Sequence, residues 1–151
     1  MDIITKLFDL DLSKFVPAMP VFLGALRALL VIIILAGPIL LVTLGAMYLL
    51  RPAPEANFKY GFRTYFGMGS VEAWRFSQRI GGLVYIILGG VMTLGALVAF
   101  IILLKSSIPT ILTGCAACLV IELILVTLTT FTLNIIISIR YDRDGYRRGK
   151  R

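Results

Sequence analysis

The sequence contains no histidine, only two cysteines, and few acidic residues. Without histidine the chain cannot build a His-based catalytic triad, an HExxH zinc site or a proximal haem ligand. Two cysteines are too few for a four-cysteine metal site or for the disulfide framework of a small secreted protein. We therefore expect no metal site and no cofactor. The 8 acidic residues are outnumbered by 15 basic ones, so the formal net charge is +7.

Apolar residues dominate what is present. They make up 59% of the 151 residues, and the mean hydropathy is +0.96. A helix of about 20 apolar residues crosses the roughly 30 Å of hydrocarbon in a bilayer, and the runs 28–50, 81–104 and 109–139 are long enough. The sequence predicts an all-α integral membrane bundle with three transmembrane helices, forming a single membrane domain over residues 1–151.

Proline and glycine mark bends and ends within this pattern. Gly37-Pro38 predicts a kink near the middle of the first span, because proline removes one helical hydrogen bond. The link between the second and third spans is so short that they must form an antiparallel hairpin. Pro109 is acceptable there in the first turn of the third helix.

The N-terminal segment, residues 1–24, precedes the first span. Apolar residues in its first 16 positions recur at helical spacing, which predicts a short amphipathic helix lying in the membrane interface. Pro17 and Pro20 would end that helix and turn the chain into the bilayer. The alternative is a partly ordered tail.

Basic residues gather on one side of the predicted membrane. The loop 51–80 and the tail 140–151 hold 11 of the 15 basic residues, and three spans place both segments on the same side. Because basic residues concentrate in cytoplasmic segments, we predict a cytoplasmic C-terminus and an external N-terminus. The tail is expected to lie on anionic lipid headgroups, and nothing beyond charge favours nucleic-acid binding.

The loop 51–80 is the most distinctive segment. It carries five aromatic residues between positions 58 and 66 and three glycines between 61 and 69. Ser70 has the character of a helix N-cap, and Glu72 falls in the first turn, where negative charge suits the helix dipole. The loop is either an interfacial segment that docks on anionic headgroups, or a fixed turn that holds Arg63 in a recognition surface.

Several positions resemble the signature loop of the SdpI family of bacterial membrane proteins. They are Asn57, Gly61-Phe62-Arg63-Thr64, Glu72-Ala73-Trp74, Ser77-Gln78-Arg79 and Gly81-Gly82. The resemblance implies a bacterial plasma (inner) membrane protein that gives immunity to a secreted peptide toxin, or senses it and holds a transcriptional repressor at the membrane. A peptide toxin and a cytoplasmic regulator are the partners it implies. The candidate recognition residues are Asn57, Tyr60, Gly61, Arg63, Thr64, Glu72, Trp74 and Arg79.

Polar residues inside the spans form a second group of candidates, Glu122, Thr129 and Asn134. Glu122 is the only ionisable residue well inside a span, and a charged carboxylate there is costly unless it is protonated, paired or hydrated. It is either part of a helix-packing stripe that also contains Cys115, Cys118 and Thr129, or a proton or ligand site.

Two other classes of function compete with a non-enzymatic role in immunity or sensing. Glycine-rich helix faces suit a homo- or hetero-oligomer, so the chain could be an accessory or scaffold subunit of a larger membrane complex or transporter. Less favoured is a small redox enzyme that uses Cys115 and Cys118, or a proton-coupled carrier that uses Glu122.

Overall fold

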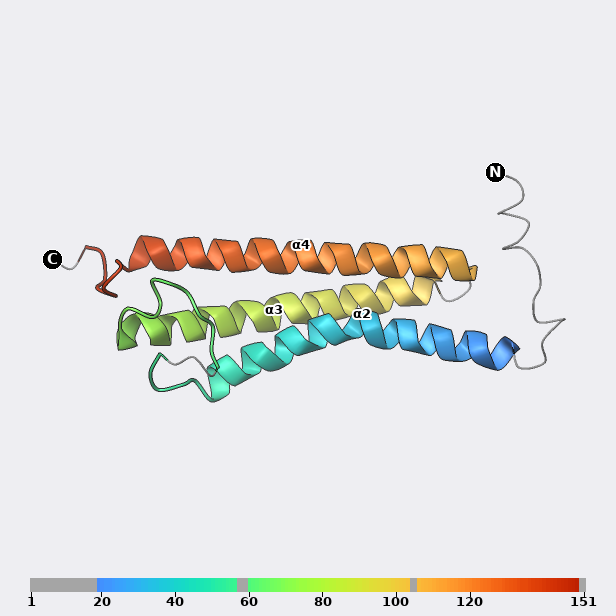
Figure 1. Cartoon of the computed structure of the whole chain (residues 1–151), viewed down its shortest axis with the longest axis horizontal. Helices are drawn as coiled ribbons and strands as arrows, with labels where there is room; N and C mark the ends of the chain where they lie inside the picture. The colour runs from blue at the N-terminus through green and yellow to red at the C-terminus, as the bar shows by residue number, and fades with distance from the viewer. Residues whose placement is uncertain (1–18, 57–59, 104–105, 150–151) are drawn as a thin grey trace.

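The computed structural model describes residues 19–56, 60–103 and 106–149, and these form a bundle of long helices (Figure 1). The helices are α2 (Met19–Leu50), α3 (Val71–Leu103) and α4 (Ile108–Arg140). All three are long and apolar enough to cross a membrane, which confirms the predicted three-helix membrane bundle. The predicted interfacial helix within residues 1–16 lies outside the described residues.

The first span differs from the prediction at its start. Residues 19–24 belong to α2, whereas the sequence pattern predicts that they lie in the N-terminal interfacial segment 1–24. Pro20 explains the difference, because a proline in the first turn of a helix has no hydrogen bond to lose and its backbone angle already suits the helix. At the other end α2 stops at Leu50, before the extended segment that Pro52 imposes.

Other local expectations are confirmed. The backbone N–H of Ala73 donates to the Ser70 hydroxyl at 3.1 Å, so Ser70 caps α3. Ser107 is the N-cap residue of α4, and Pro109 lies in its first turn. Figure 1 shows α2 changing direction near its middle, where Pro38 lies inside the helix.

The tightest packing in the bundle joins α2 to α3. A Cβ atom on Gly89 would lie 2.7 Å from the carbonyl oxygen of Pro38, and one on Gly82 would lie 2.9 Å from that of Gly45. These glycines therefore let the two backbones approach each other directly. Helix α4 is held to α3 by a hydrogen bond between the hydroxyls of Tyr85 and Thr130, 3.0 Å apart.

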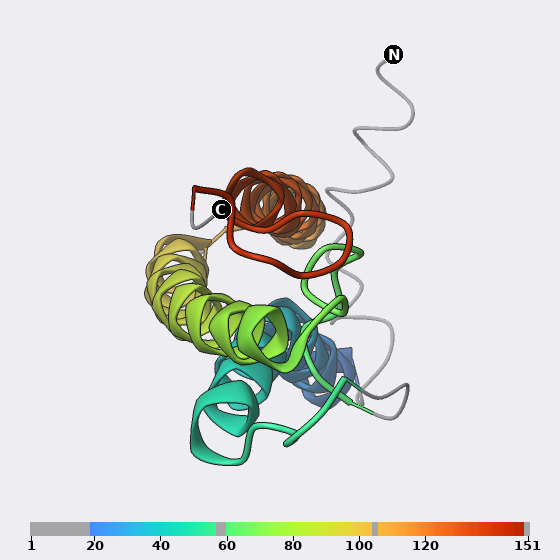
Figure 2. The same ribbon diagram turned by 90° about the vertical axis from the view of Figure 1, so that its left-hand side faces the viewer.

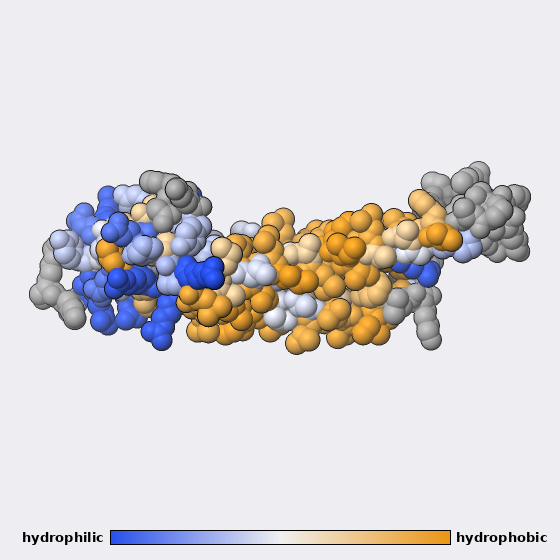
Figure 3. Space-filling model, turned by 90° about the horizontal axis from the view of Figure 1, so that it is seen from below, coloured by the Kyte–Doolittle hydropathy of each residue, from blue (hydrophilic) through white to orange (hydrophobic). Residues whose placement is uncertain are grey.

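Polar and apolar surfaces separate along the bundle. Figure 3 shows a broad apolar band over the middle of the molecule and a hydrophilic cap at one end. That end holds the loop between α2 and α3 and the chain that follows α4 (Figures 1 and 2). We call it the basic end and define it as the described residues of the loop 51–70, residues 71–79 of α3, and the tail 141–149.

Candidate functional site

Trp74 anchors the loop of the basic end. It lies in the first turns of α3 and is fully buried. Its indole N–H donates to the backbone carbonyl of Ala53 at 2.8 Å, and Ala53 is itself buried. One side chain thus ties the start of the loop to the start of the next helix while satisfying its only polar group.

Gln78, one helical turn after Trp74, fixes the middle of the loop. Its side-chain oxygen accepts from the backbone N–H of Phe62 at 2.9 Å, and its side-chain nitrogen donates to the Phe62 carbonyl at 3.0 Å. Both groups of one loop residue are therefore paired by one buried amide. The Phe62 ring packs over Gly81, where a Cβ would lie 2.8 Å from it.

Gly61 makes that arrangement possible. Its φ of 123° is a backbone conformation that residues with a side chain rarely adopt. A Cβ at this position would also lie 2.7 Å from the Trp74 ring. Three residues on, the buried Thr64 hydroxyl accepts from the backbone N–H of Gly67 at 2.9 Å and closes a compact turn.

The tail folds back onto the start of α3. Within the tail, one carboxylate oxygen of Asp142 accepts from the backbone N–H groups of Asp144 and Tyr146. The Ser70 hydroxyl donates to the Gly145 carbonyl at 2.7 Å. Ser70 therefore caps α3 and latches the tail with the same oxygen, and Figure 2 shows the tail curving back over the loop end of the bundle.

Tyr141 seals the junction between the tail and the bundle. It is 2% exposed, and its ring packs against that of Phe76 with centroids 5.6 Å apart. The Arg140 guanidinium lies over the Phe76 ring, 4.4 Å from the ring centroid. Burial raises the pKa of Tyr141, and the Glu72 charge raises it further, against smaller opposing effects of Arg140 and Arg147.

The predicted recognition residues divide into two groups by direction. Gly61, Thr64 and Trp74 point inward and hold the loop in shape. The outward group is exposed and consists of Tyr60, Arg63, Glu72 and Arg79. Asn57 lies outside the described residues. The basic end is thus a fixed platform with aromatic and charged groups on its surface.

A shallow cavity of about 290 Å³ opens beside this platform, between the end of α2 and the first turns of α3. Arg75 and Arg79, one turn apart, line it together with Tyr48 and Pro52. No carboxylate lines the cavity, so two guanidinium groups set its charge. It suits an anionic group at the membrane surface.

The intramembrane candidates occupy different environments. Glu122 extends toward α2, where a Cβ on Gly37 would lie 2.9 Å from its carboxylate oxygen. The Asn134 amide donates to the carbonyl of Thr130 in its own helix, and Thr129 is half-buried. Of these three residues, Glu122 directs its carboxylate toward another helix, whereas the Asn134 amide bonds within its own helix.

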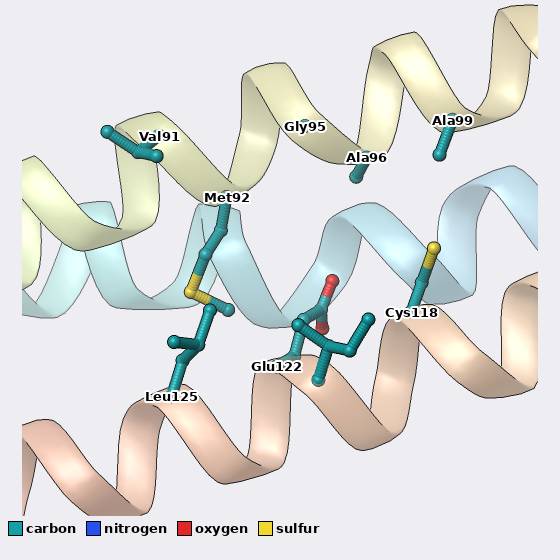
Figure 4. A pocket seen from close by; sticks show the side chains of 9 residues that line it. Val91, Met92, Gly95, Ala96, Ala99, Cys118, Glu122 and Leu125 are labelled. Carbon is teal, nitrogen blue, oxygen red and sulfur yellow. The ribbon is translucent and has the colours of Figure 1, made fainter.

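Glu122 also lines a cavity of about 340 Å³ between α3 and α4 (Figure 4). Its other walls are apolar or small residues. Cys118 lines the same cavity, and both Cys115 and Cys118 are free thiols. In the described part of the chain, no group of three or more acidic or cysteine residues could hold a metal ion.

Three contacts that build the basic end are not predicted from the sequence: those of Gln78 with Phe62, of Tyr141 with Phe76, and of Ser70 with Gly145. A local signal existed for Gln78, because it shares one helical face with Trp74 and with the glycines at 81 and 82. For the other two, the partner lies about 70 residues away in the chain, as with Ser70 and Gly145, and no local pattern indicates such a contact.

Comparison with known proteins gives one match. A family model described as the SdpI/YfhL protein family matches residues 55–139, more than half of the chain. The matched region begins in the loop of the basic end and runs through α3 and most of α4. No curated protein and no solved structure matches the chain significantly.

Proposed function

Because the chain belongs to the SdpI/YfhL family, we propose that it protects a bacterial cell from a secreted antimicrobial peptide, or senses that peptide. The observation that supports this role best is the division of the family-like loop into inward and outward residues. Gly61, Thr64 and Trp74 build a fixed turn. This turn holds Arg63 on the surface, and Arg79 is exposed on α3. A rigid, charged platform is what recognition of a partner requires.

The proposed orientation places the basic end in the cytoplasm of a bacterial plasma membrane. Its loop and tail hold most of the basic residues, and the positive-inside rule then sets the direction. On this arrangement the platform meets a cytoplasmic regulator, while the peptide reaches the protein from the outside or through the bilayer. The anionic headgroups of the inner leaflet would contact Arg75 and Arg79.

We further propose that the protein acts without catalysis. The SdpI/YfhL family is not a known enzyme family, and the platform gives its polar side chains structural partners instead of poising them for reaction. Ser70, Thr64 and Gln78, for example, each form hydrogen bonds with the backbone. Binding, and the change in position or partner that follows it, is the activity that these residues support.

Expression in a peptide-sensitive host tests this function. The host carries either the full chain or an empty vector and is challenged with a panel of purified bacterial peptide toxins. We expect the inhibitory concentration of at least one peptide to rise several-fold with the full chain. The proposal is wrong if the chain gives resistance to no peptide in the panel and if no peptide changes which proteins copurify with the chain from membrane extracts.

A second candidate function is that of a subunit in a larger membrane complex. Gly90 in α3 supports it, because a Cβ there would meet no atom within 4 Å, leaving room for another helix to approach closely. The mass of the particle in mild detergent distinguishes the two functions. A complex subunit would copurify with other chains, whereas the immunity protein alone gives multiples of 16.6 kDa.

A further inference from the structure

The cavity beside Glu122 differs from the cavity of the basic end in having a mostly apolar lining with one carboxyl group. It lies between residues 91–99 of α3 and residues 118–125 of α4 (Figure 4), and most of its lining residues are apolar. Val91 and Met92 line one end of its α3 wall, and the small residues Gly95, Ala96 and Ala99 line the rest and leave space there. Its volume of about 340 Å³ falls at the lower end of the range for small-molecule sites, about 300 to 1,000 Å³.

One carboxyl group interrupts these apolar walls. Figure 4 shows the Glu122 carboxylate projecting from α4 into the space between the helices. Gly37 of α2 provides room for it, since any side chain there would displace the carboxylate oxygen. The carboxyl group thus extends from α4, has room beside α2, and lines the cavity between α3 and α4.

The residues that the structure describes provide no counter-ion for this carboxyl. None of the cavity-lining residues is basic, and no hydrogen bond or ion pair of Glu122 occurs within residues 19–56, 60–103 and 106–149. An ionisable group at this depth is costly unless a proton or a cation neutralises it. A cation that enters the cavity must itself be soluble in the bilayer, which requires an apolar body.

We propose that this cavity binds an apolar molecule bearing a single amine group, which enters from the lipid phase and pairs with Glu122. The neutral amine accepts the proton of the carboxyl group, and the resulting ammonium and carboxylate form a pair with no net charge. The apolar body lies against Gly95, Ala96 and Ala99. This site is separate from the platform of the basic end and does not depend on the proposed immunity function.

Decylamine is a suitable probe, with decanol as a matched molecule that has the same chain but no basic group. Radiolabelled probe is titrated against the full chain in nanodiscs of neutral phosphatidylcholine, and binding to empty nanodiscs is subtracted. We expect saturable decylamine binding that is about tenfold or more tighter than decanol binding, the contribution of one charged hydrogen bond. Glu122→Gln should remove that difference.

Two neighbouring glycine variants separate the cavity from general effects on α3. Gly95→Leu adds a side chain to the cavity wall and keeps the carboxyl, so it should abolish saturable binding. Gly90→Leu adds the same side chain at a position that also opens onto free space but does not line the cavity. The decylamine affinity of this variant should equal that of the unchanged protein. This pair tests the site even if Glu122→Gln does not fold.

Three results would overturn the proposal. Absence of saturable decylamine binding to the unchanged protein is the first. The second is a decylamine affinity of Glu122→Gln equal to that of the unchanged protein, since the cavity would then recognise only the apolar chain of the probe. Equal decylamine affinity in Gly95→Leu is the third, because the probe would then bind elsewhere on the protein.

Discussion

Two side chains of the basic end, those of Gln78 and Ser70, each form two structural hydrogen bonds. The Gln78 amide pairs both backbone groups of Phe62, and the Ser70 hydroxyl both caps α3 and holds Gly145. A buried backbone group without a partner costs about 1–3 kcal/mol. The loop therefore depends strongly on a few side chains, although many aromatic residues surround them.

Replacing Gln78 with methionine, which has a similar shape, leaves the Phe62 N–H and C=O groups without partners. We expect the free energy of unfolding to fall by about 2 kcal/mol or more, measured by denaturant titration in bicelles. Arg79→Met, at the neighbouring exposed position, is the matched control and should change stability little. Equal stability of the two variants would show that the Gln78 pairing contributes nothing.

Tyr141 supplies a prediction about pH. Burial raises its pKa above the ordinary value of about 10, so the folded state binds the phenolic proton more tightly than the unfolded state does. Its contribution to stability is therefore complete below pH of about 10 and is lost as pH rises through the higher folded pKa.

Difference absorbance of tyrosinate, unchanged protein minus Tyr141→Phe, measures that titration directly. The missing component should titrate above the usual tyrosine range. A component with an ordinary or lowered pKa would mean that Tyr141 is not sealed against Phe76, and that the tail is not docked.

At the scale of elements, α2 and α3 form one unit and α4 is less tightly attached. Glycines bring the first two helices into backbone contact at Gly82 and Gly89. The looser junction with α4 leaves the cavity beside Glu122. The positions of small residues on α3 thus explain both its close packing against α2 and the cavity that separates it from α4.

Adjacent glycines of α3 test this difference. A Cβ on Gly89 would lie 2.7 Å from a backbone oxygen of α2, whereas one on Gly90 would meet nothing within 4 Å. Gly89→Leu should therefore lower the free energy of unfolding by about 2 kcal/mol or more, because backbone cannot yield as a side chain can. Gly90→Leu should be neutral or slightly stabilising, since leucine favours helices. Equal losses would contradict the packing.

Much of the element structure could be predicted from the sequence, because its causes are local. Apolar runs define the three spans, Ser70 and Pro109 mark helix starts, and Pro38 marks the bend. The start of α2 was predicted too late because Pro20 suits either a helix end or a first turn. The docking of the tail could not be predicted, since Ser70 meets Gly145 only after two spans have turned back.

The geometry of the candidate loop could be predicted only in part, for the same reason. The resemblance selects the loop as a candidate site, but sequence alone does not separate Trp74, which is buried, from Arg63, which lies on the surface. Whether a loop side chain points toward a neighbouring helix or toward solvent depends on tertiary packing. Similarly, the composition of α4 made Glu122 a candidate, while the cavity beside it depends on small residues in another helix.

The molecule as a whole combines an apolar bundle with a folded, positively charged end. Loop and tail, separated in sequence by two helices, join there into one surface through Ser70 and Tyr141. The central claim is that residues exposed on this surface carry out recognition, while inward residues of the same loop carry the fold. Variants that remove one positive charge at different places on this end separate specific recognition from general electrostatics.

The most direct test compares Arg63→Ala with Arg143→Ala in the peptide-sensitive host. Both residues are exposed at the basic end, and each change removes one positive charge, but only Arg63 belongs to the family-like loop. We predict equal amounts of both proteins in the membrane, full resistance with Arg143→Ala, and resistance reduced to the vector level with Arg63→Ala. Full resistance with Arg63→Ala at normal abundance would contradict the account.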